Sequence, residues 1–258
     1  MQAHRAAHGA AHADLPRYDD LDVTGWYGPA PAGGVAPLRV AAVGDSTLTG
    51  PGLDHARHTF VGRVAAQAGV AVHVTRFAVG GSRVADVLMT QLPTVLDAAP
   101  DLVVLSVGAN DAVHSTPLAQ FERDLRAVVG ALDRAGIETL VCGLIDLSLI
   151  PRIPPMLRTM LRQRGAAYER RKVRATRSAA RAVHVEVDRR VNDHFRARGE
   201  DCFTADRFHP NGEGHRLLAE ALAPHFHAAV ARAQSAAGSL RTIQSGNQFT
   251  AKYAASSA

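Results

Sequence analysis

Apolar and amphipathic segments alternate along the chain from Leu38 onward. The apolar segments are short and rich in β-branched residues, which is typical of strands buried on both faces of a sheet. The segments between them repeat apolar residues at intervals of three and four, which is typical of helices. The predicted strands cover residues 38–43, 70–79, 101–107, 137–144 and 182–187, and the predicted helices cover residues 60–68, 84–99, 118–135, 189–198 and 212–233, with a long basic helix after the proline-rich loop 150–155.

This alternation predicts an α/β fold, in the form of a three-layer α/β/α sandwich around a five-stranded parallel sheet. Parallel strands need crossover connections, and such crossovers are right-handed, so helices cover both faces of the sheet. Ligands of such sheets bind beyond the carboxyl ends of the strands. The residues that directly follow each predicted strand are therefore the first candidates for function.

Two segments lie outside the alternation. Residues 1–36 are polar and then rich in proline and glycine, which predicts an N-terminal arm ahead of a single domain at residues 37–234. Residues 235–258 show no sustained periodicity and predict a flexible C-terminal tail. The first residues contain no apolar core of signal-peptide length, and no apolar run reaches the roughly 20 residues of a membrane span, so we expect a cytoplasmic location.

The formal net charge of +5 is concentrated in one predicted helix. We interpret this helix as having a solvated basic face, with a contact to anionic lipid headgroups or to an acidic partner as the alternatives. Because no nucleic-acid motif accompanies the charge, we expect no nucleic-acid partner. Residues 158–181 contain a single acid, Glu169, and the basic residues Arg158, Arg162, Arg164, Arg170, Arg171, Lys172, Arg174, Arg177 and Arg181.

The first strand ends in Gly44-Asp45-Ser46, which has two interpretations. Glycine, aspartate and serine are common in turns and helix caps. A serine at the edge of a parallel sheet is also well placed to act as a nucleophile if a base lies nearby. In either case we expect Asp45 to brace the loop by accepting hydrogen bonds from backbone N–H groups.

Three further predicted loops carry the groups that an activated serine needs. Gly81 follows the second strand, and Asn110 with Asp111 follows the third, so a backbone N–H and a side-chain amide are available to an oxyanion. Asp206 and His209 precede the last helix, at a spacing that lets the acid orient the imidazole as a general base. Ser82 is a rival nucleophile, but no acid and base pair lies near it in the sequence.

The blocks GDS, AVGGS, GAND and DRFHP, in this order and at these strand ends, resemble the SGNH (GDSL) hydrolase family. The resemblance implies a flavodoxin-like sheet, no metal and no organic cofactor. It also implies that Ser46 is the nucleophile, that Ser46, Gly81 and Asn110 form the oxyanion hole, that Asp206 and His209 complete the catalytic triad, and that Asp45 and Asp111 support the site.

Two positions depart from the family pattern. Arg76 stands where many members carry asparagine, which leaves the catalytic assignment in place and changes the local hydrogen bonding. Ser46 is followed by Thr-Leu-Thr-Gly, where the older consensus has leucine, and this indicates a lysophospholipase or acyl-esterase branch.

The sequence therefore predicts a serine-dependent hydrolase of carboxylic esters that forms an acyl-enzyme. We expect small to medium acyl chains or lysophospholipid-like substrates, with the loop 150–155 and the start of the basic helix as substrate walls. A carbohydrate O-deacetylase or O-acyltransferase, and a thioesterase or peptidase-like enzyme, would use the same residues. A non-catalytic binding module is the alternative from a different class.

Overall fold

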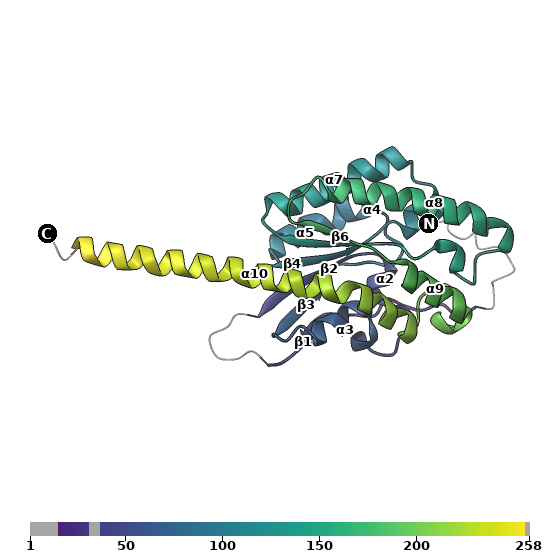
Figure 1. The fold of residues 1–258 in the computed structure, drawn as a ribbon, viewed down its shortest axis with the longest axis horizontal. Helices are drawn as coiled ribbons and strands as arrows, with labels where there is room; N and C mark the ends of the chain where they lie inside the picture. Colours follow the sequence, from purple (N-terminus) through teal and green to yellow (C-terminus); the bar gives the residue numbers. More distant parts are fainter. Residues whose placement is uncertain (1–14, 31–36, 256–258) are drawn as a thin grey trace.

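A computed structural model describes the backbone of residues 15–30 and 37–255, and the side chains of these residues up to 235. Its centre is a six-stranded sheet in the order β1-β3-β2-β4-β5-β6 (Figure 1). The strands are β1 (Gly25–Tyr27), β2 (Leu38–Gly44), β3 (Val72–Arg76), β4 (Leu102–Ser106), β5 (Glu138–Cys142) and β6 (Ala182–Val185).

The five predicted strands are present and parallel to one another, with β2 in the middle between β3 and β4. The prediction of five strands is nevertheless one short. Strand β1 pairs antiparallel with β3 at the sheet edge and comes from the segment predicted as an arm. A strand of three residues is too short for its alternation to be recognised in the sequence.

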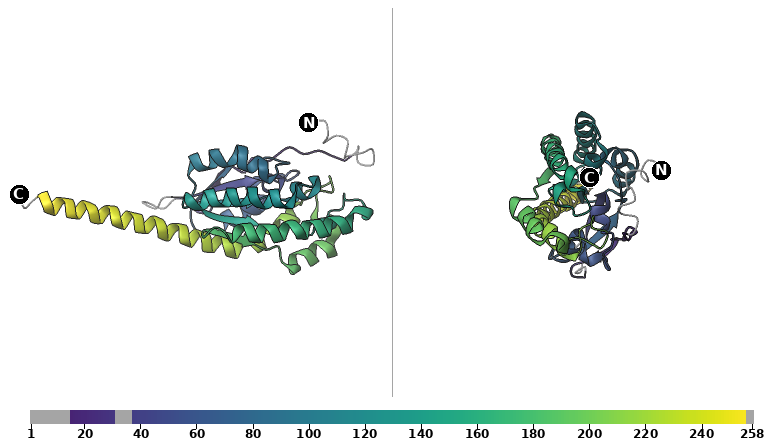
Figure 2. Two further views of the ribbon diagram at one scale, coloured as in Figure 1. Left: turned by 90° about the horizontal axis from the view of Figure 1, so that it is seen from above. Right: turned by 90° about the vertical axis from the view of Figure 1, so that its right-hand side faces the viewer.

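Helices cover both faces of the sheet, which gives the predicted three layers (Figure 2). One layer contains α4 (Val84–Asp86), η3 (Val87–Gln91), α5 (Leu92–Ala98), α7 (Leu118–Arg134) and α8 (Pro155–Thr176), and the other contains α3 (Phe60–Ala66) and the first part of α10 (Gly212–Ala255). The shorter elements α2 (Ser46–Thr49), η2 (Ala56–His58), α6 (Ala109–His114), η4 (Leu147–Leu149), α9 (Arg189–Arg198) and η5 (Gly199–Cys202) lie in the connections.

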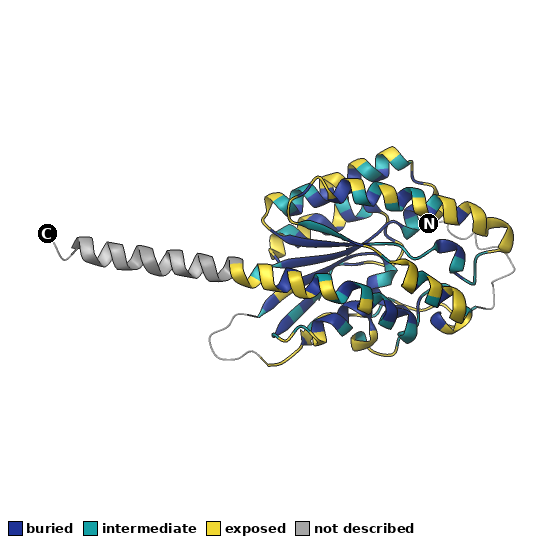
Figure 3. Cartoon of the chain, viewed as in Figure 1, coloured by how far each residue is buried: buried dark blue, intermediate teal, exposed yellow. Residues whose placement is uncertain are grey.

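The strand side chains divide between two cores. On β2, Val40 and Ala42 face the core under α3 and α10, whereas Ala41 and Val43 face the core under α5, α7 and α8. This period of two is what a strand dictates, and both faces are buried, as Figure 3 shows. The sheet is therefore a rigid support whose carboxyl edge carries the loops.

Helix α10 is longer than the sequence predicts. It continues to Ala255, so the described backbone of the predicted tail is helical. The segment is rich in alanine and has no proline after Pro224, which suits a helix even without an amphipathic period. The proposed domain limits themselves stay a prediction. None of the described helices combines the length and apolarity needed to cross a bilayer.

Candidate active site

Strand β2 delivers Ser46 to the carboxyl edge of the sheet through a turn that requires glycine. Gly44 has φ +134°, and a Cβ at this position would lie 1.8 Å from the carbonyl oxygen of Ser106. The next residue, Asp45, is buried, and its Oδ1 accepts a hydrogen bond from the backbone N–H of Thr47 (3.0 Å). Asp45 is thus the N-cap of α2, and Ser46 is the first residue of that helix. The segment Gly44-Asp45-Ser46 therefore forms a turn and helix cap and also places Ser46 at the edge of the sheet.

The turn before α10 brings Asp206 and His209 into contact. Nδ1 of His209 lies 2.6 Å from Oδ2 of Asp206, while Oδ1 of Asp206 accepts from the hydroxyl of Thr204 (2.7 Å) and from the N–H groups of Phe208 (2.8 Å) and His209 (3.0 Å). Burial opposes the charged carboxylate, but these hydrogen bonds outweigh burial and hold the pKa of Asp206 well below its usual range. The ionised acid therefore fixes the proton on Nδ1 and leaves Nε2 of His209 as the basic nitrogen.

The turn itself is held by two backbone hydrogen bonds. The N–H of Thr204 donates to the carbonyl of His209, and the N–H of Arg207 donates to the carbonyl of Thr204, both over 2.8 Å. Arg207 adopts φ +59°, a left-handed conformation that costs a non-glycine residue about 1 kcal/mol or more. The strain is local to the residue between Asp206 and Phe208, and it closes the turn tightly enough for the acid to reach the imidazole.

The predicted oxyanion donors lie beyond the carboxyl ends of β3 and β4, the two strands that flank β2. Gly81 follows β3 with φ +82°, and the space where its Cβ would stand is open. Asn110 lies in the first turn of α6 after β4, and its Nδ2 donates to the carbonyl of Ser82 (3.1 Å). This bond joins the two loops and leaves the second N–H of the amide available. The loop after α2 meets the turn that carries Asp206 and His209, because a Cβ on Gly52 would lie 2.9 Å from the side chain of Thr204. All the predicted site residues therefore gather at one edge of the sheet.

Gln91 supports the turn at Gly44, and no motif in the sequence indicated this role. Its Oε1 accepts from the N–H of Gly44 (2.8 Å), and its Nε2 donates to the carbonyl of Gly44 (2.9 Å) and to Oγ of Ser82 (3.1 Å). The residue lies in η3, a π-helical segment just before α5, where Pro93 has no N–H for a regular helical bond. The helix predicted over residues 84–99 is present, with a π-helical segment ahead of its internal proline, and Gln91 ends that segment.

Asp20 links the nucleophile helix to the glycine loop, and it comes from the predicted arm. One oxygen of its carboxylate accepts from the hydroxyl of Thr49 (2.6 Å) and the other from the N–H of Gly80 (2.8 Å). Arg76, the residue that departs from the family pattern, lies 3.7 Å from the same carboxylate. Residues 15–30 are therefore part of the support for the site, which the sequence pattern did not indicate.

Lys172 is fully buried, so the interpretation of the basic helix as one solvated face is wrong at this residue. Its ammonium donates to the carbonyl of Cys142 and lies 3.9 Å from Glu169. Burial raises the pKa values of Asp45 and Asp111, and the nearby charge of Lys172 opposes that rise at both. Each of these acids has one carboxylate oxygen without a hydrogen-bond partner among the described residues. The buried ammonium of Lys172 thus favours the charged form of both acids.

The other basic residues of the segment 158–181 divide into paired and exposed groups. Arg162, Arg171 and Arg181 form ion pairs with Asp146, Glu122 and Glu138, and Arg164 donates to Ala112 and Ser115. The solvated-face interpretation holds for the exposed residues Arg158, Arg170, Arg174 and Arg177.

Asp111 supports the loops in the way the sequence predicts for a bracing residue. Its Oδ2 accepts from the N–H of Val84 (3.0 Å), which ties the start of α6 to the start of α4. The rival nucleophile Ser82 is buried and its hydroxyl is bonded to Gln91, so it lies below the exposed edge. Among the described residues, no group of three or more histidine, cysteine, aspartate or glutamate side chains is arranged to hold a metal.

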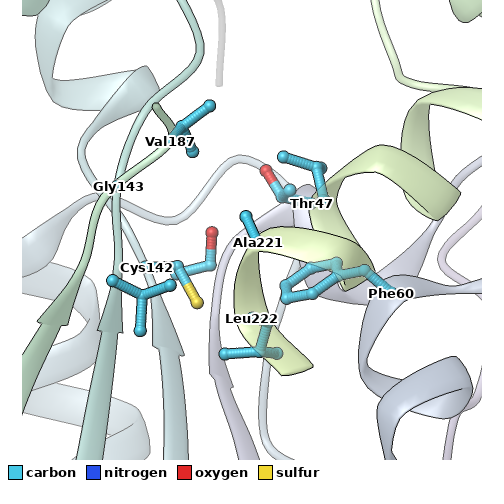
Figure 4. Close-up of a pocket in the computed structure, with 10 residues that line it drawn as sticks. Thr47, Phe60, Cys142, Gly143, Val187, Ala221 and Leu222 are labelled. Carbon is cyan, nitrogen blue, oxygen red and sulfur yellow. The ribbon is translucent and has the colours of Figure 1, made fainter. Parts of the chain in front are cut away.

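A small cavity lies behind the nucleophile helix and not over it (Figure 4). It has a volume of about 20 Å³, enough for one water-sized group, and its walls include Thr47, Phe60, Cys142 and Leu222. Ser46, Gly81, Asn110 and His209 do not line it. The cavity therefore belongs to the interior, and a substrate would approach from the exposed edge.

The fold and the site define an α/β protein with a serine, an acid–imidazole pair and amide donors at the carboxyl edge of a parallel sheet. The chain belongs to the GDSL-like lipase/acylhydrolase family, whose model matches residues 42–217. This confirms the resemblance seen in the four sequence blocks; the finer assignment to a lysophospholipase or acyl-esterase branch stays a prediction.

Three known proteins illustrate the similarity. A GDSL-like esterase of Mycobacterium tuberculosis is 30% identical over 190 residues, which are 72% of this chain and 60% of that protein. The chain thus spans 60% of the length of this relative. An acetylxylan esterase from Geobacillus stearothermophilus has a TM-score of 0.60 at 17% identity, covering 74% of this chain and 95% of the other. A psychrotrophic esterase from Pseudoalteromonas sp. has a TM-score of 0.56 at 16% identity, covering 71% and 93%. These structural similarities show a shared fold.

Proposed function

We propose that the protein hydrolyses carboxylic esters through an acyl-enzyme on Ser46. The observation that carries the proposal is the 2.6 Å contact between His209 and Asp206 at the sheet edge that also presents Ser46. Such a pair supplies the base that a serine hydroxyl lacks on its own. Family membership and the 30% identity to a GDSL-like esterase support the same assignment.

In the first step, Oγ of Ser46 attacks the ester carbonyl and His209 takes the hydroxyl proton on Nε2. Asp206 stays ionised and stabilises the resulting imidazolium through Nδ1. The negative charge that develops on the carbonyl oxygen is met by the N–H groups of Ser46 and Gly81 and by the free N–H of Asn110.

In the second step, His209 returns its proton to the departing alcohol and the tetrahedral intermediate collapses to the acyl-enzyme. Water then enters, His209 removes a proton from it, and the hydroxide attacks the acyl carbon. A second collapse releases the carboxylic acid and restores the hydroxyl of Ser46. The proton balance closes on His209 in both halves of the cycle.

The acetylxylan esterase supports the assignment of the acid and the base. Variants of that enzyme described as catalytic mutants replace a serine, an aspartate and a histidine, and the aspartate and histidine are three positions apart. Asp206 and His209 have the same spacing. The same neighbour favours a carbohydrate O-deacetylase as the second candidate function.

For the substrate, we propose small to medium acyl esters or lysophospholipid-like esters. The small cavity behind α2 cannot hold an acyl chain. The acyl group of the substrate would therefore lie along the open edge of the sheet, beside the loop 150–155. The O-acyltransferase alternative differs only in the acceptor that attacks the acyl-enzyme. The cytoplasmic location stays a prediction from the sequence.

The proposal is tested by hydrolysis of p-nitrophenyl esters from acetate to laurate. Ser46→Ala should lower kcat by about 10⁴ or more, whereas Ser82→Ala should retain most of it. Equal rates for the wild type and Ser46→Ala, with both proteins folded, would contradict the proposal. Acetylated xylan and added sugar acceptors in the same assay separate the hydrolase from the deacetylase and the transferase.

A further inference from the structure

The first two turns of α8 expose three large apolar side chains. Met156, Leu157 and Met160 are 86%, 40% and 41% exposed, and Met156 has the largest exposed fraction among the large apolar residues described. Isolated exposed apolar residues are ordinary on a protein surface. Here the spacing of one and four residues places all three on one side of one helix end. We call this cluster the α8 tip.

Positive charge surrounds the α8 tip. The segment from Leu147 to Tyr168 contains no acidic residue, and it contains four arginines: Arg152, Arg158, Arg162 and Arg164. The side chain of Arg158 is exposed and donates to the carbonyl of Ile153 (3.3 Å), which keeps its charge beside the tip. Arg162 forms an ion pair with Asp146 (3.2 Å). Apolar side chains bordered by arginines are typical of helices that lie at the surface of anionic lipid.

The α8 tip flanks the entrance to the site. The N–H of Arg152 donates to the carbonyl of Arg207 (2.9 Å), and Arg207 lies in the turn between Asp206 and His209. Helix α8 starts three residues after Arg152, and its first turns extend past the carboxyl edge of the sheet, where they are exposed (Figures 1 and 3). A surface that contacts the tip therefore also faces the catalytic turn.

We propose that the α8 tip docks the protein on an anionic lipid surface, with the three apolar side chains in the interface and Arg158 against the headgroups. The docking proposal rests on the proposed ester hydrolysis for its biological purpose, since docking would bring lipid esters to Ser46. Binding to lipid can nevertheless be measured without any ester hydrolysis. The charge argument selects lipid over a second copy of this chain, because two tips facing each other would oppose like charges.

Vesicle sedimentation tests the docking independently of catalysis. The Ser46→Ala protein is mixed with vesicles of phosphatidylcholine alone or with phosphatidylglycerol, and the pelleted fraction is measured. We expect binding to the anionic vesicles that weakens with added salt. The double substitution Met156→Ser and Met160→Ser should reduce binding to vesicles at least about tenfold. Each methionine that enters the lipid contributes to the binding free energy on the scale of a fully buried apolar side chain.

Two matched controls define the surface. Met89→Ser removes another highly exposed methionine, in η3, and should leave vesicle binding unchanged. Arg158→Gln should weaken binding to anionic vesicles, whereas Arg174→Gln, about 24 Å further along the same helix, should not. Circular dichroism of each variant establishes that it is folded.

Equal pelleting of the parent and the double variant would overturn the docking proposal. It would also be overturned by a dimer in analytical ultracentrifugation that the double variant converts to a monomer, since a second copy would then be the occupant. Ester hydrolysis without vesicle binding would leave the proposed function standing and remove the docking. Vesicle binding that depends on the α8 tip, with no hydrolysis of any ester, would support the docking proposal and contradict the proposed function.

Discussion

The side-chain amide of Gln91 is hydrogen-bonded to both backbone groups of Gly44, over 2.8 Å and 2.9 Å. This pairing fixes the peptide at the end of β2, two residues before Ser46. It adds to the backbone contacts of the strand end, where the N–H of Val79 donates to the carbonyl of Gly44 (3.1 Å) and the N–H of Asp45 donates to the carbonyl of Ser106 (3.0 Å). The position of the serine is thus set by a residue 45 positions later in the chain.

Replacement of Gln91 by alanine should affect activity as well as stability. It leaves the buried N–H of Gly44 without its partner, while the carbonyl of Gly44 keeps the N–H of Val79 (3.1 Å), and this costs about 1–3 kcal/mol of unfolding free energy. A shift of Ser46 by a fraction of an ångström should lower kcat/KM by about 10- to 100-fold. Urea unfolding and ester hydrolysis measure the two effects. Gln163→Ala, at an exposed position of α8, is the control and should change neither; a full-rate Gln91→Ala enzyme would show that the pairing is not needed.

Asp20→Ala should reduce kcat with a moderate loss of stability. The substitution removes the carboxylate that joins Thr49 to Gly80, so α2 and the glycine loop are no longer held together. We expect about a tenfold lower kcat and a loss of about 1–2 kcal/mol. The adjacent exposed residue provides the control, because Asp19→Ala should stay within about 0.5 kcal/mol of the wild type. Identical kinetics for the two variants would remove Asp20 from the support of the site.

Lys172→Met should be strongly destabilising. Without the ammonium, the buried carboxylates of Asp45 and Asp111 lose their nearby cation, and Cys142 loses a donor to its carbonyl. Removal of one partner of a buried charge network typically costs about 3–5 kcal/mol. Arg170→Met, two residues earlier on the exposed side of α8, should be nearly neutral in the same thermal and urea unfolding experiments. Comparable stability of both variants would show that the buried charge is dispensable.

The sequence predicted the elements whose signal is local. Strand ends and short motifs point directly to the predicted site residues, which are Gly44-Asp45-Ser46, Gly81, Asn110 and the pair Asp206–His209. In the structure they lie at the carboxyl edge of the sheet. The supporting contacts are not local. Gln91, Asp20 and Lys172 reach their partners across elements far apart in the chain, and no periodicity marks them.

Lys172 illustrates why composition misleads. In a helix with many arginines it resembles one more solvated cation, and only the structure shows that its side chain is buried and bonded to the carbonyl of Cys142. Strand β1 was missed for a related reason, because its three residues form a strand only by pairing with β3.

His215 should make stability depend on pH. Burial, together with the charges of Arg63 and His209, lowers the pKa of its buried imidazole to about 3, against about 6.5 in an unfolded chain. Below about pH 6.5 the unfolded state therefore binds a proton that the folded state does not. The stabilisation is complete above that pH and is lost as the pH falls toward about 3, at up to about 1.4 kcal/mol per pH unit.

Urea unfolding between about pH 7.5 and about pH 5 measures this slope. His215→Asn keeps an acceptor for the N–H of Phe60 and should flatten the slope by up to one proton. His227→Gln, at an exposed position, should leave it as in the wild type. A slope unchanged by His215→Asn would mean that this imidazole does not control the acid limb.

The central claim is that Ser46 is an activated nucleophile. Reaction with a fluorophosphonate, followed by peptide mass spectrometry, tests it most directly, because only an activated serine displaces the fluoride at a useful rate. The account predicts one phosphonyl group on the peptide that contains Ser46, no labelling of Ser46→Ala, and slow labelling of His209→Ala. Phosphonyl groups on Ser82, or equal labelling of the wild type and Ser46→Ala, would contradict it.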